Sequence, residues 1–561
     1  MNRPISRREL LRLAAVLAGG VGLIGLPRIM TLRPIDQPHG SAPTAPGVGP
    51  RVIHVHSSNA TSWNFSSGWY GNYVDQNQVD NMVDRGLREL TGRSTVAEAW
   101  NALLPGYSAG KGIAIKMNFN NSNGCSDSDN VIDGLIEPVN AMIRGMKLNG
   151  VREQDIWIYD AIRAIPVRFR SRCSYSGVHF VDHECAESAT FDSTQPNASV
   201  AFANANLKAR HLADVLINAT YVINMPIIKD HGISGVTLSF KNHFGSIQYV
   251  MGAEADNLHD FIEPGNSAYR ANYSPIVEIN SSPHIRSKTV LIVGDGLFGG
   301  LGNTNVVPSR WQTFGNAASN SLFFATDPVA IDCVMMDVLY AEPTDHPYQG
   351  AGSDDYLKLA AAAGLGVFEH GQPWGTGYSL IDYRRVEADT QVATLNLSPG
   401  WNLIGLPISP AIDYTAESAT AEIAAQGGNC TEIDRWLSGG WDAYMRGLPF
   451  NNFLIAPGAG FLFKCAQSSV WSLTGYPIQQ PKAVTLDAGW NPITIPYSAA
   501  PLTAAGLLAG INAQGGTGLE VDRWVNGDWS AYVNGFPLND FTIENGKGYF
   551  VKCSASSIYI P

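Results

Sequence analysis

Short apolar segments alternate with segments of helical spacing from about residue 51 to residue 387, and this alternation constrains the fold more than any other feature. We expect strands at 51–56, 112–118, 155–160, 178–181, 221–228, 289–293 and 321–325, and helices that include 79–90, 131–148 and 328–339. Alternation of this kind predicts an α/β fold with a mostly parallel sheet and helices on both of its faces.

The sequence changes character after about residue 386, where Trp, Gly and Asn become frequent and an internal repeat begins. Gly400-Trp-Asn-Leu-Ile-Gly-Leu-Pro407 aligns with Gly489-Trp-Asn-Pro-Ile-Thr-Ile-Pro496, and Asp434-Arg-Trp436 aligns with Asp522-Arg-Trp524. The repeat predicts two small β-rich tandem modules, at 392–476 and 481–561, each with one short helix. They resemble the GWNLI-type repeats found at the C-termini of exported bacterial proteins.

Length and charge limit the classes of function. With 561 residues the chain is too long for one hydrophobic core, and the α/β pattern predicts a first domain over 51–388. The formal net charge of −12 argues against a general nucleic-acid partner. No apolar run long enough to cross a membrane follows the N-terminus, so an uncleaved signal is the one span that we consider.

The N-terminus has the pattern of a targeting segment. Ser6-Arg7-Arg8-Glu9-Leu10-Leu11-Arg12 precedes a short apolar, Gly-rich run, which resembles a twin-arginine export signal over 1–32. A Pro/Gly-rich linker is expected over 33–50. Export by this route predicts a periplasmic, extracellular or cell-surface protein.

The seven cysteines contain no C-x-x-C pair. The spacing therefore excludes a standard iron–sulfur binding run and a zinc ribbon. Cys173 and Cys185 are close enough in the sequence to pair in an oxidising compartment, although sequence cannot establish the connectivity. The odd number leaves at least one thiol unpaired within the chain.

Lysine, histidine and asparagine side chains gather where the expected strands end, which is where parallel α/β sheets bind ligands. The run 221–228 leads into Lys229, Asp230 and His231, and Lys241, Asn242 and His243 follow within fifteen residues. We therefore expect a pocket for a small anion. In it Lys116, Lys229 and Lys241 hold the anion, His231 acts as acid or base, and Asn118, Asn242, His243 and Gly296 contact the substrate.

A divalent metal is the alternative cofactor for this pocket, with His231, Asp160, Asp295 and Asp327 as ligands. Asp327 precedes Pro328, so a helix N-cap is an equal interpretation of this residue. Gly294-Asp-Gly-Leu-Phe-Gly299 fits G-x-G-x-x-G, but no regular helix is expected after it. We interpret it as a mobile glycine loop that closes over the pocket rather than as a dinucleotide site.

Residues 51–387 resemble the domain of unknown function 362 family (DUF362), on five ordered segments. They are Lys116-x-Asn118; Asn224-Met-Pro-Ile-Ile-Lys-Asp-His231, similar to N-x-P-x-x-K-x-H; Thr237 to Gly245, similar to T-x-x-x-K-N-x-x-G; the glycine segment from Asp295; and Ala325 to Asp332, similar to S-x-D-P-V-A-x-D. Many family members add an iron–sulfur segment, which this chain lacks. The resemblance implies the family rather than an activity.

Two hypotheses of function follow. In the first, the chain is an exported enzyme that binds a small anionic substrate through Lys, His and Asp residues at strand ends. In the second, it is a non-catalytic envelope or cell-surface binding protein whose repeats mediate attachment, for example to polysaccharide. Four aromatic residues bear on the second hypothesis, because they could stack on sugars or pack in the cores of the modules: Trp401, Trp436, Trp441 and Tyr444.

Overall fold

The computed structural model describes residues 49–93, 95–248, 256–437, 439–478, 483–496, 501–525, 527–536 and 538–561. The expected export signal (1–32) and most of the expected linker (33–48) lie outside the described residues. The chain divides into two compact units, one ending at Thr390 and the other beginning at Gln391. Within the described ranges, no helix has the length and apolar character needed to span a bilayer.

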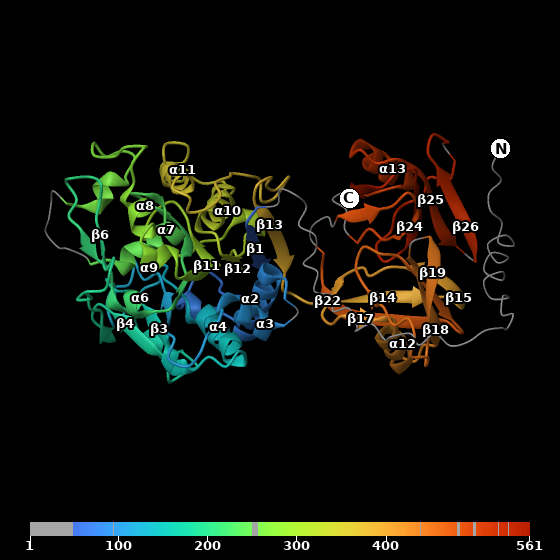
Figure 1. The fold of residues 1–561 in the computed structure, drawn as a ribbon, viewed down its shortest axis with the longest axis horizontal. Coiled ribbons are helices and arrows are strands. Elements are labelled where there is room, and N and C mark those ends of the chain that lie inside the picture. Colours follow the sequence, from blue (N-terminus) through green and yellow to red (C-terminus); the bar gives the residue numbers. More distant parts are fainter. Residues whose placement is uncertain are drawn as a thin grey trace, which may run out of the picture. The chain divides into compact units, whose positions relative to one another are not determined.

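The first unit is built on an eleven-stranded sheet (Figure 1). Its path is β13-β1-β12-β11-β8-β2-β3-β4-β5, while β9 pairs with β11 and β10 pairs with β9. Most pairs are parallel, and the exceptions are β12 with both neighbours and β10 with β9. The strands are β1 (Arg51–His56), β2 (Ile113–Lys116), β3 (Ile156–Tyr159), β4 (His179–Asp182), β5 (Glu187–Ser188), β8 (Tyr221–Asn224), β9 (Ile227–His231), β10 (Gly235–Val236), β11 (Thr289–Gly300), β12 (Ser321–Ala325) and β13 (Asp382–Glu387).

Successive residues of the central strands enter two different cores, so both faces of the sheet are covered. In β2, Ala114 belongs to one buried cluster, whereas Ile113 and Ile115 belong to the other. This is the alternation that a pleated strand imposes, and with the parallel pairing it confirms the predicted fold class. One cluster includes residues of α2 (Gln76–Thr91), α3 (Val96–Leu103), α4 (Ile136–Leu148) and α5 (Val167–Arg170). The other includes residues of α6 (Asp214–Asn218), α7 (Ser239–Asn242), α8 (Pro275–Asn280), α9 (Pro283–Arg286), α10 (Pro328–Tyr340) and α11 (Asp355–Ala362).

The apolar run 221–228 forms two strands rather than the single strand expected. β8 ends at Asn224, and β9 begins at Ile227. Pro226 lies between them and has no N–H for the ladder, while its carbonyl oxygen accepts from the Asp295 N–H. Lys229 and His231 therefore lie within β9 and not beyond the end of a strand, which corrects the sequence interpretation.

The predicted mobile glycine loop is also wrong, because the segment 294–299 belongs to β11. Its glycines allow close packing rather than motion. A Cβ at Gly294 would lie 2.5 Å from the sulfur of Met335, and one at Gly299 would lie 2.2 Å from the Trp311 ring. Both neighbours are distant in the sequence, so the repeated glycines could not reveal this role.

From Gln391 onward, the described residues of the second unit form small antiparallel sheets and two helices. Two four-stranded sheets have equivalent orders, β15-β21-β18-β19 and β24-β27-β25-β26. The elements of the first are β15 (Gly400–Ile404), β18 (Cys430–Leu437), β19 (Gly440–Met445) and β21 (Phe461–Cys465), with α12 (Ala416–Ala425). Those of the second are β24 (Gly489–Ile493), β25 (Gly518–Val525), β26 (Asp528–Val533) and β27 (Tyr549–Cys553), with α13 (Ala504–Ala513). Further pairings add β14 (Gln391–Leu397), β16 (Ser409–Pro410), β17 (Tyr414–Thr415), β20 (Leu454–Ile455), β22 (Ser469–Tyr476), β23 (Val484–Leu486) and β28 (Ser557–Tyr559).

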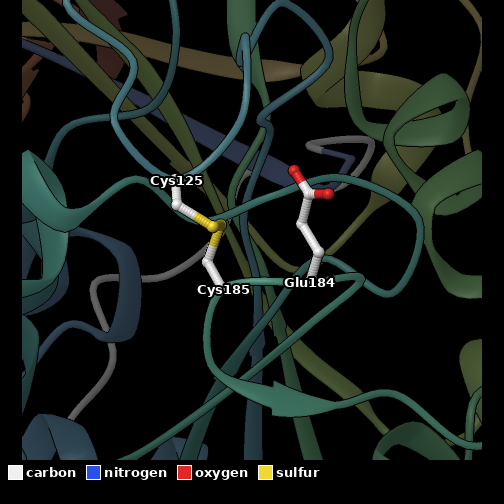
Figure 2. A group of neighbouring side chains, drawn as sticks. All are labelled: Cys125, Glu184 and Cys185. Carbon is white, nitrogen blue, oxygen red and sulfur yellow. A yellow bond between two sulfur atoms is a disulfide. The ribbon is translucent and has the colours of Figure 1, made fainter.

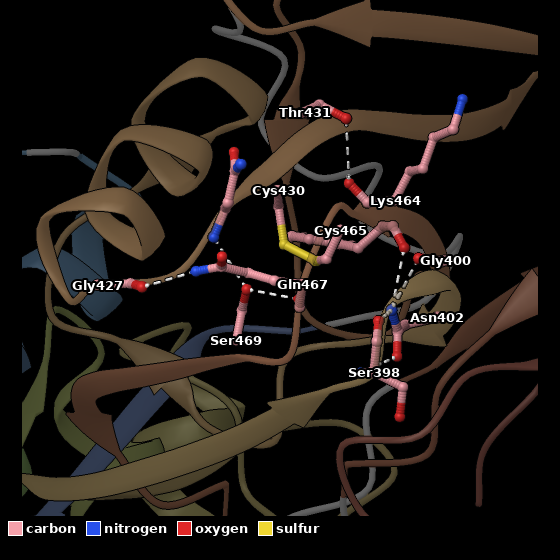
Figure 3. The surroundings of a disulfide bond; sticks show 12 residues. Ser398, Gly400, Asn402, Gly427, Cys430, Thr431, Lys464, Cys465, Gln467 and Ser469 are labelled. Carbon is pink, nitrogen blue, oxygen red and sulfur yellow. Dashed lines mark hydrogen bonds between the residues drawn. A yellow bond between two sulfur atoms is a disulfide. The ribbon is translucent and has the colours of Figure 1, made fainter.

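Cysteine pairing differs between the two modules. Cys430 and Cys465 form a disulfide between β18 and β21 (Figure 3). At the equivalent place in the second module, Cys553 lies opposite Gly518 and is a free, buried thiol. Gly518 stands where the first module has Cys430, so Cys553 has no cysteine opposite it with which to form the equivalent disulfide.

The aromatic residues of the modules pack against one another. Phe550 lies 5.6 Å from Trp441 and 5.3 Å from Trp529 between ring centroids, so it joins rings of both modules. Tyr444 is buried in the core of the first module. Trp401 accepts a hydrogen bond at its carbonyl from Trp524 Nε1. These contacts favour the packing interpretation of the aromatic residues over an open sugar platform.

Candidate functional site

Three adjacent parallel strands end side by side and carry the polar residues of the site. In the register of the sheet, Lys116 at the end of β2 lies between Tyr159 of β3 and Asn224 of β8. Asp160 follows β3 directly, and Asn118 follows β2. The carboxyl ends of parallel strands thus collect these side chains at one edge, as the strand-end rule predicts.

A buried ion pair lies at the centre of this edge. Lys116 Nζ is 3.1 Å from Asp160 Oδ2, and both side chains are almost completely buried. The same Nζ donates to Asn242 Oδ1 at 3.2 Å, which also accepts from Asn118 Nδ2. Asn242 in turn donates to Asn224 Oδ1 at 2.7 Å. The network fixes Asn242 relative to three strand ends.

Two residues place α7, which carries Lys241 and Asn242. Asp332 of α10 accepts from the backbone N–H groups of Ser239 and Phe240, the first residues of α7. Gly245 follows α7 and lies against the ion pair, because a Cβ there would be 2.4 Å from Lys116 Nζ. Any side chain at Gly245 would displace the lysine or the helix.

A small cavity of about 30 Å³ opens between these elements. Its charged lining residues are three cations, Lys116, Arg163 and Lys241, and one carboxylate, Asp160. Thr237 also lines it, and its buried Oγ1 has no hydrogen-bond partner among the described residues. The excess of cations and an unsatisfied hydroxyl suit a small polar anion. The remaining lining residues are Asn118, Asn120, Ile162, His231, Asn242, Phe244 and Gly245.

His231 keeps a single neutral tautomer. Its Nδ1 accepts from the backbone N–H groups of Ile233 and Ser234 at 3.1 and 3.2 Å, so the hydrogen of the neutral ring is on Nε2. Burial, together with the charges of Lys241 and Lys229, lowers the pKa of His231 far below its usual range. His231 is therefore a neutral ring that lines the cavity and has its one N–H donor at Nε2, rather than a cation.

Lys241 has no carboxylate partner within the part of the chain that the structure describes. Its Nζ lies 3.2 Å from His259 Nε2 and 3.8 Å from the centroid of the Phe244 ring. Burial, then the charges of Lys229 and Arg163, lowers the pKa of Lys241 to about 7. The charge of Lys241 and burial lower the pKa of His259 to about 3. Lys241 consequently titrates near neutrality beside a neutral imidazole.

Lys229 and His243 lie close to the cavity but do not line it. Lys229 Nζ donates to the carbonyl oxygen of Thr304 at 3.1 Å, and it acts on Lys241 and His231 only through its charge. His243 Nδ1 lies 3.0 Å from Ser246 Oγ, which is also hydrogen-bonded to the Tyr159 hydroxyl. Burial lowers the pKa of His243 to about 3. Its position suits a support for the strand end better than a substrate contact.

Gly296 and Asp295 belong to β11 and are absent from the cavity lining. Gly296 pairs with Ser321 in the sheet. Asp295 accepts from the backbone N–H groups of Leu135 and Leu297. The structure thus separates Asp295 from His231 and Asp160, the two predicted metal ligands that do line the cavity.

Asp327 is the N-cap of α10. Its Oδ1 accepts from the Val329 and Ala330 N–H groups at 2.9 Å, with Pro328 at the first helical position. Its other oxygen accepts from the Val367 N–H. The structure favours the capping interpretation.

We expect Asp327→Ala to lower the free energy of unfolding by about 1–2 kcal/mol, because the cap is lost. Asp327→Asn keeps an acceptor and should cost much less. Denaturant unfolding of both variants, with metal content measured in parallel, separates the two interpretations. Equal metal loss in both variants would favour a ligand role for Asp327.

The predicted ligands His231, Asp160, Asp295 and Asp327 do not gather. Across the described ranges, the one group of three or more ligand-type side chains within 4.8 Å is Cys125, Glu184 and Cys185 (Figure 2). Its two sulfur atoms form a disulfide, which leaves no thiolate to bind a metal. The pairing of Cys173 with Cys185, which their spacing in the sequence suggested, is therefore wrong, and Cys173 is a free cysteine.

Sequence reasoning missed two residues of the site, Arg163 and His259. Arg163 lies on the loop after β3 and His259 in the short 3-10 helix η4 (Leu258–Phe261), and neither stands at a strand end. Asp332 ends the segment that resembles S-x-D-P-V-A-x-D, and the structure shows that its carboxylate positions α7.

A larger cleft of about 610 Å³ lies elsewhere in the first unit, beside α10 and α11. His370 in its lining is 2.6 Å from Asp337 and 3.4 Å from Asp354. These two carboxylates raise the pKa of His370 to about 9 against the effect of its burial. The cleft is wide and its charges are already paired, so we favour the small cavity, where Lys241 has no carboxylate partner among the described residues.

Comparison with known proteins gives limited guidance. No curated protein matches this chain. A crystal structure of a protein from Thermotoga maritima is similar to it over 48% of this chain and 58% of that chain, less than two thirds of its length. The sequence identity is 11% and the TM-score 0.24, which carries no argument about function. Residues 113–337, which include every residue that lines the small cavity, match the model of the family described as a domain of unknown function, DUF362.

Proposed function

We propose that this chain is an exported enzyme that binds a small anionic substrate, a carboxylate, in the cavity beside Lys116, Lys241 and Arg163. The observation that carries the proposal is the convergence of Lys116, His231 and Lys241 on one cavity with three cations and one carboxylate. Asn118 and Asn242 orient the substrate in this scheme, and His231 donates from Nε2. A metal held by His231 and Asp160 remains the alternative cofactor proposal.

Two disulfides support the location outside the cytoplasm. Cys125–Cys185 and Cys430–Cys465 each join segments distant in the sequence. Such bonds persist in oxidising compartments and are rare in the cytosol. They support the proposed export, which the segment resembling a twin-arginine signal also suggests.

Arg163 offers a direct test, because its side chain is exposed and its replacement should leave the fold intact. Arg163→Gln is expected to weaken acetate binding by roughly three- to tenfold, since a partly solvated charge-assisted contact is lost. Isothermal titration calorimetry measures the affinity. Arg286→Gln, an exposed arginine outside the cavity lining, is the matched control. Equal affinities in all three proteins would contradict the proposed site.

Acetate affinity is also expected to fall as the pH rises from about 6 to 8. Protonated Lys241 attracts the carboxylate, and the pKa of Lys241 is about 7, so the charge is lost across this interval. His231 and His259 keep their charge state there, because both pKa values lie far lower. Titrations at several pH values measure the effect, with Lys241→Met expected to bind weakly at all of them. A flat profile in the wild type would contradict this role of Lys241.

The second candidate is a non-catalytic envelope protein whose repeats attach it to a surface. One observation favours it: Trp441 is 39% exposed and lies in a ring pair with Trp436. Binding of the full chain to cell-wall polysaccharide, lost in Trp441→Ala while acetate binding persists, would support attachment by the modules. No polysaccharide binding by the wild type would remove this candidate.

A further inference from the structure

A further proposal concerns the reaction that takes place in the cavity, and it rests on the anion site proposed above. We propose that Lys241 forms an imine with a substrate that carries a carbonyl group next to its carboxylate, a small 2-oxo acid. The basic side chains of the cavity then have two roles. One side chain holds the carboxylate as a cation, and the other reacts with the carbonyl carbon as a neutral amine.

The surroundings of Lys116 and Lys241 differ in the way this division requires. Lys116 is paired with Asp160 at 3.1 Å and hydrogen-bonded to Asn242. Lys241 has the Phe244 ring and the His259 imidazole as neighbours. Among the described residues, no carboxylate pairs with it. An ion pair keeps an amine protonated, whereas burial and nearby cations favour the neutral amine.

The charge state of Lys241 supports the same assignment. A lysine in water is almost entirely protonated at neutral pH. Burial, Lys229 and Arg163 lower the pKa of Lys241 to about 7, so a large fraction of it is a free amine. Desolvation and a neighbouring cation are the two devices by which proteins activate a lysine nucleophile.

Other lining groups fit the remaining parts of a 2-oxo acid. The Arg163 guanidinium can take the carboxylate, and His231 Nε2–H is a donor for the carbonyl oxygen. Thr237 Oγ1 is buried and unpartnered among the described residues. The volume of about 30 Å³ favours a small substrate, so glyoxylate and pyruvate are suitable probes.

The step balances without a further reactant. The lone pair of Lys241 Nζ forms a bond to the carbonyl carbon, and the carbonyl π bond breaks toward oxygen. The oxygen then takes the two hydrogens of the amine and leaves as water, which forms the C=N bond. No electrons are gained or lost by the pair, so neither oxidant nor reductant is required.

Reductive trapping tests the proposal on the full chain. With glyoxylate or pyruvate and sodium cyanoborohydride, we expect one saturable secondary-amine adduct, on Lys241, identified by peptide mass spectrometry. Acetate should protect Lys241 from trapping. Lys241→Arg should lose the adduct, and Lys358→Arg, at an exposed surface lysine, should keep it. Adducts spread over surface lysines, with Lys241 unmodified, would overturn the proposal.

The two proposals can fail separately. Acetate has no carbonyl group that forms an imine, so its binding reports on the anion site alone. Binding of acetate with no trapping at Lys241 overturns the imine and leaves the anion site standing. Absence of both overturns both proposals. If both hold, trapping should accelerate as the pH rises through about 7, while acetate affinity falls.

Discussion

Replacing Asp160 with Asn is expected to lower the free energy of unfolding of the first unit by about 3–5 kcal/mol, because the buried Lys116 ammonium loses its counter-charge. Lys116 is 0% exposed, and Asp160 Oδ2 is the one carboxylate oxygen that pairs with its Nζ in the described structure. Lys116→Met should cost a similar amount. It leaves the Asp160 carboxylate buried, with the Phe119 and Ile162 N–H groups as its remaining donors.

The double variant separates the energy of the Lys116–Asp160 ion pair from the effects of its surroundings. Lys116→Met with Asp160→Asn removes both charges and should cost clearly less than the sum of the single changes. Lys147→Met is the matched control, since this exposed lysine pairs with Glu153 and its loss should cost at most about 1 kcal/mol.

Pulse-labelling hydrogen exchange across a urea series, followed in peptides of β2 and β3, measures the first unit alone. Bulk fluorescence would mix the signals of the two units, because multi-domain chains commonly unfold in more than one transition. Single-variant losses no larger than that of Lys147→Met would show that the pair is not buried as described.

The sheet could be predicted because its strands are buried on both faces. Continuous apolar segments such as Ile113–Lys116 and Ser321–Ala325 leave few alternatives, and the structure places strands at both. The prediction was wrong where one residue acted through distant neighbours. Pro226 divided an apolar run, and Gly294 and Gly299 joined a strand because Met335 and Trp311 pack against them.

The candidate site was predictable to the same extent. Lys116, Asn118 and Asp160 follow from the rule that ligands bind at the carboxyl ends of parallel strands, and the structure brings them to one cavity. Arg163, on a loop, and His259, in the 3-10 helix Leu258–Phe261, could not be found this way, because neither follows a strand end and tertiary contacts fix their positions. Asp295 and Asp327 have the residue type of metal ligands, yet their oxygens are occupied by backbone N–H groups. Residue type alone cannot distinguish a carboxylate that binds a metal from one that accepts hydrogen bonds from backbone N–H groups.

Removing the disulfide between Cys125 and Cys185 is expected to lower the free energy of unfolding of the first unit by about 2–4 kcal/mol. The two cysteines are 60 residues apart, and cross-linking a loop of that length restricts the unfolded chain strongly. The bond joins a loop after β2 to a loop after β4 (Figure 2). Cys125→Ser with Cys185→Ser is the test, and Cys173→Ser, at a free cysteine, is the control with little expected change.

The same variant should weaken acetate binding, because the loop after β4 supports the mouth of the cavity. Asp182 accepts from the N–H groups of Cys185 and Ile165, and the Arg163 carbonyl accepts from the His183 N–H. Loss of the cross-link therefore frees the segment that carries Arg163. Hydrogen exchange in peptides of the first unit and acetate affinity from calorimetry should change together in the double variant. Full stability and affinity in that variant, or free thiols at both positions in protein purified from its native compartment, would contradict both the structural role and the oxidising location.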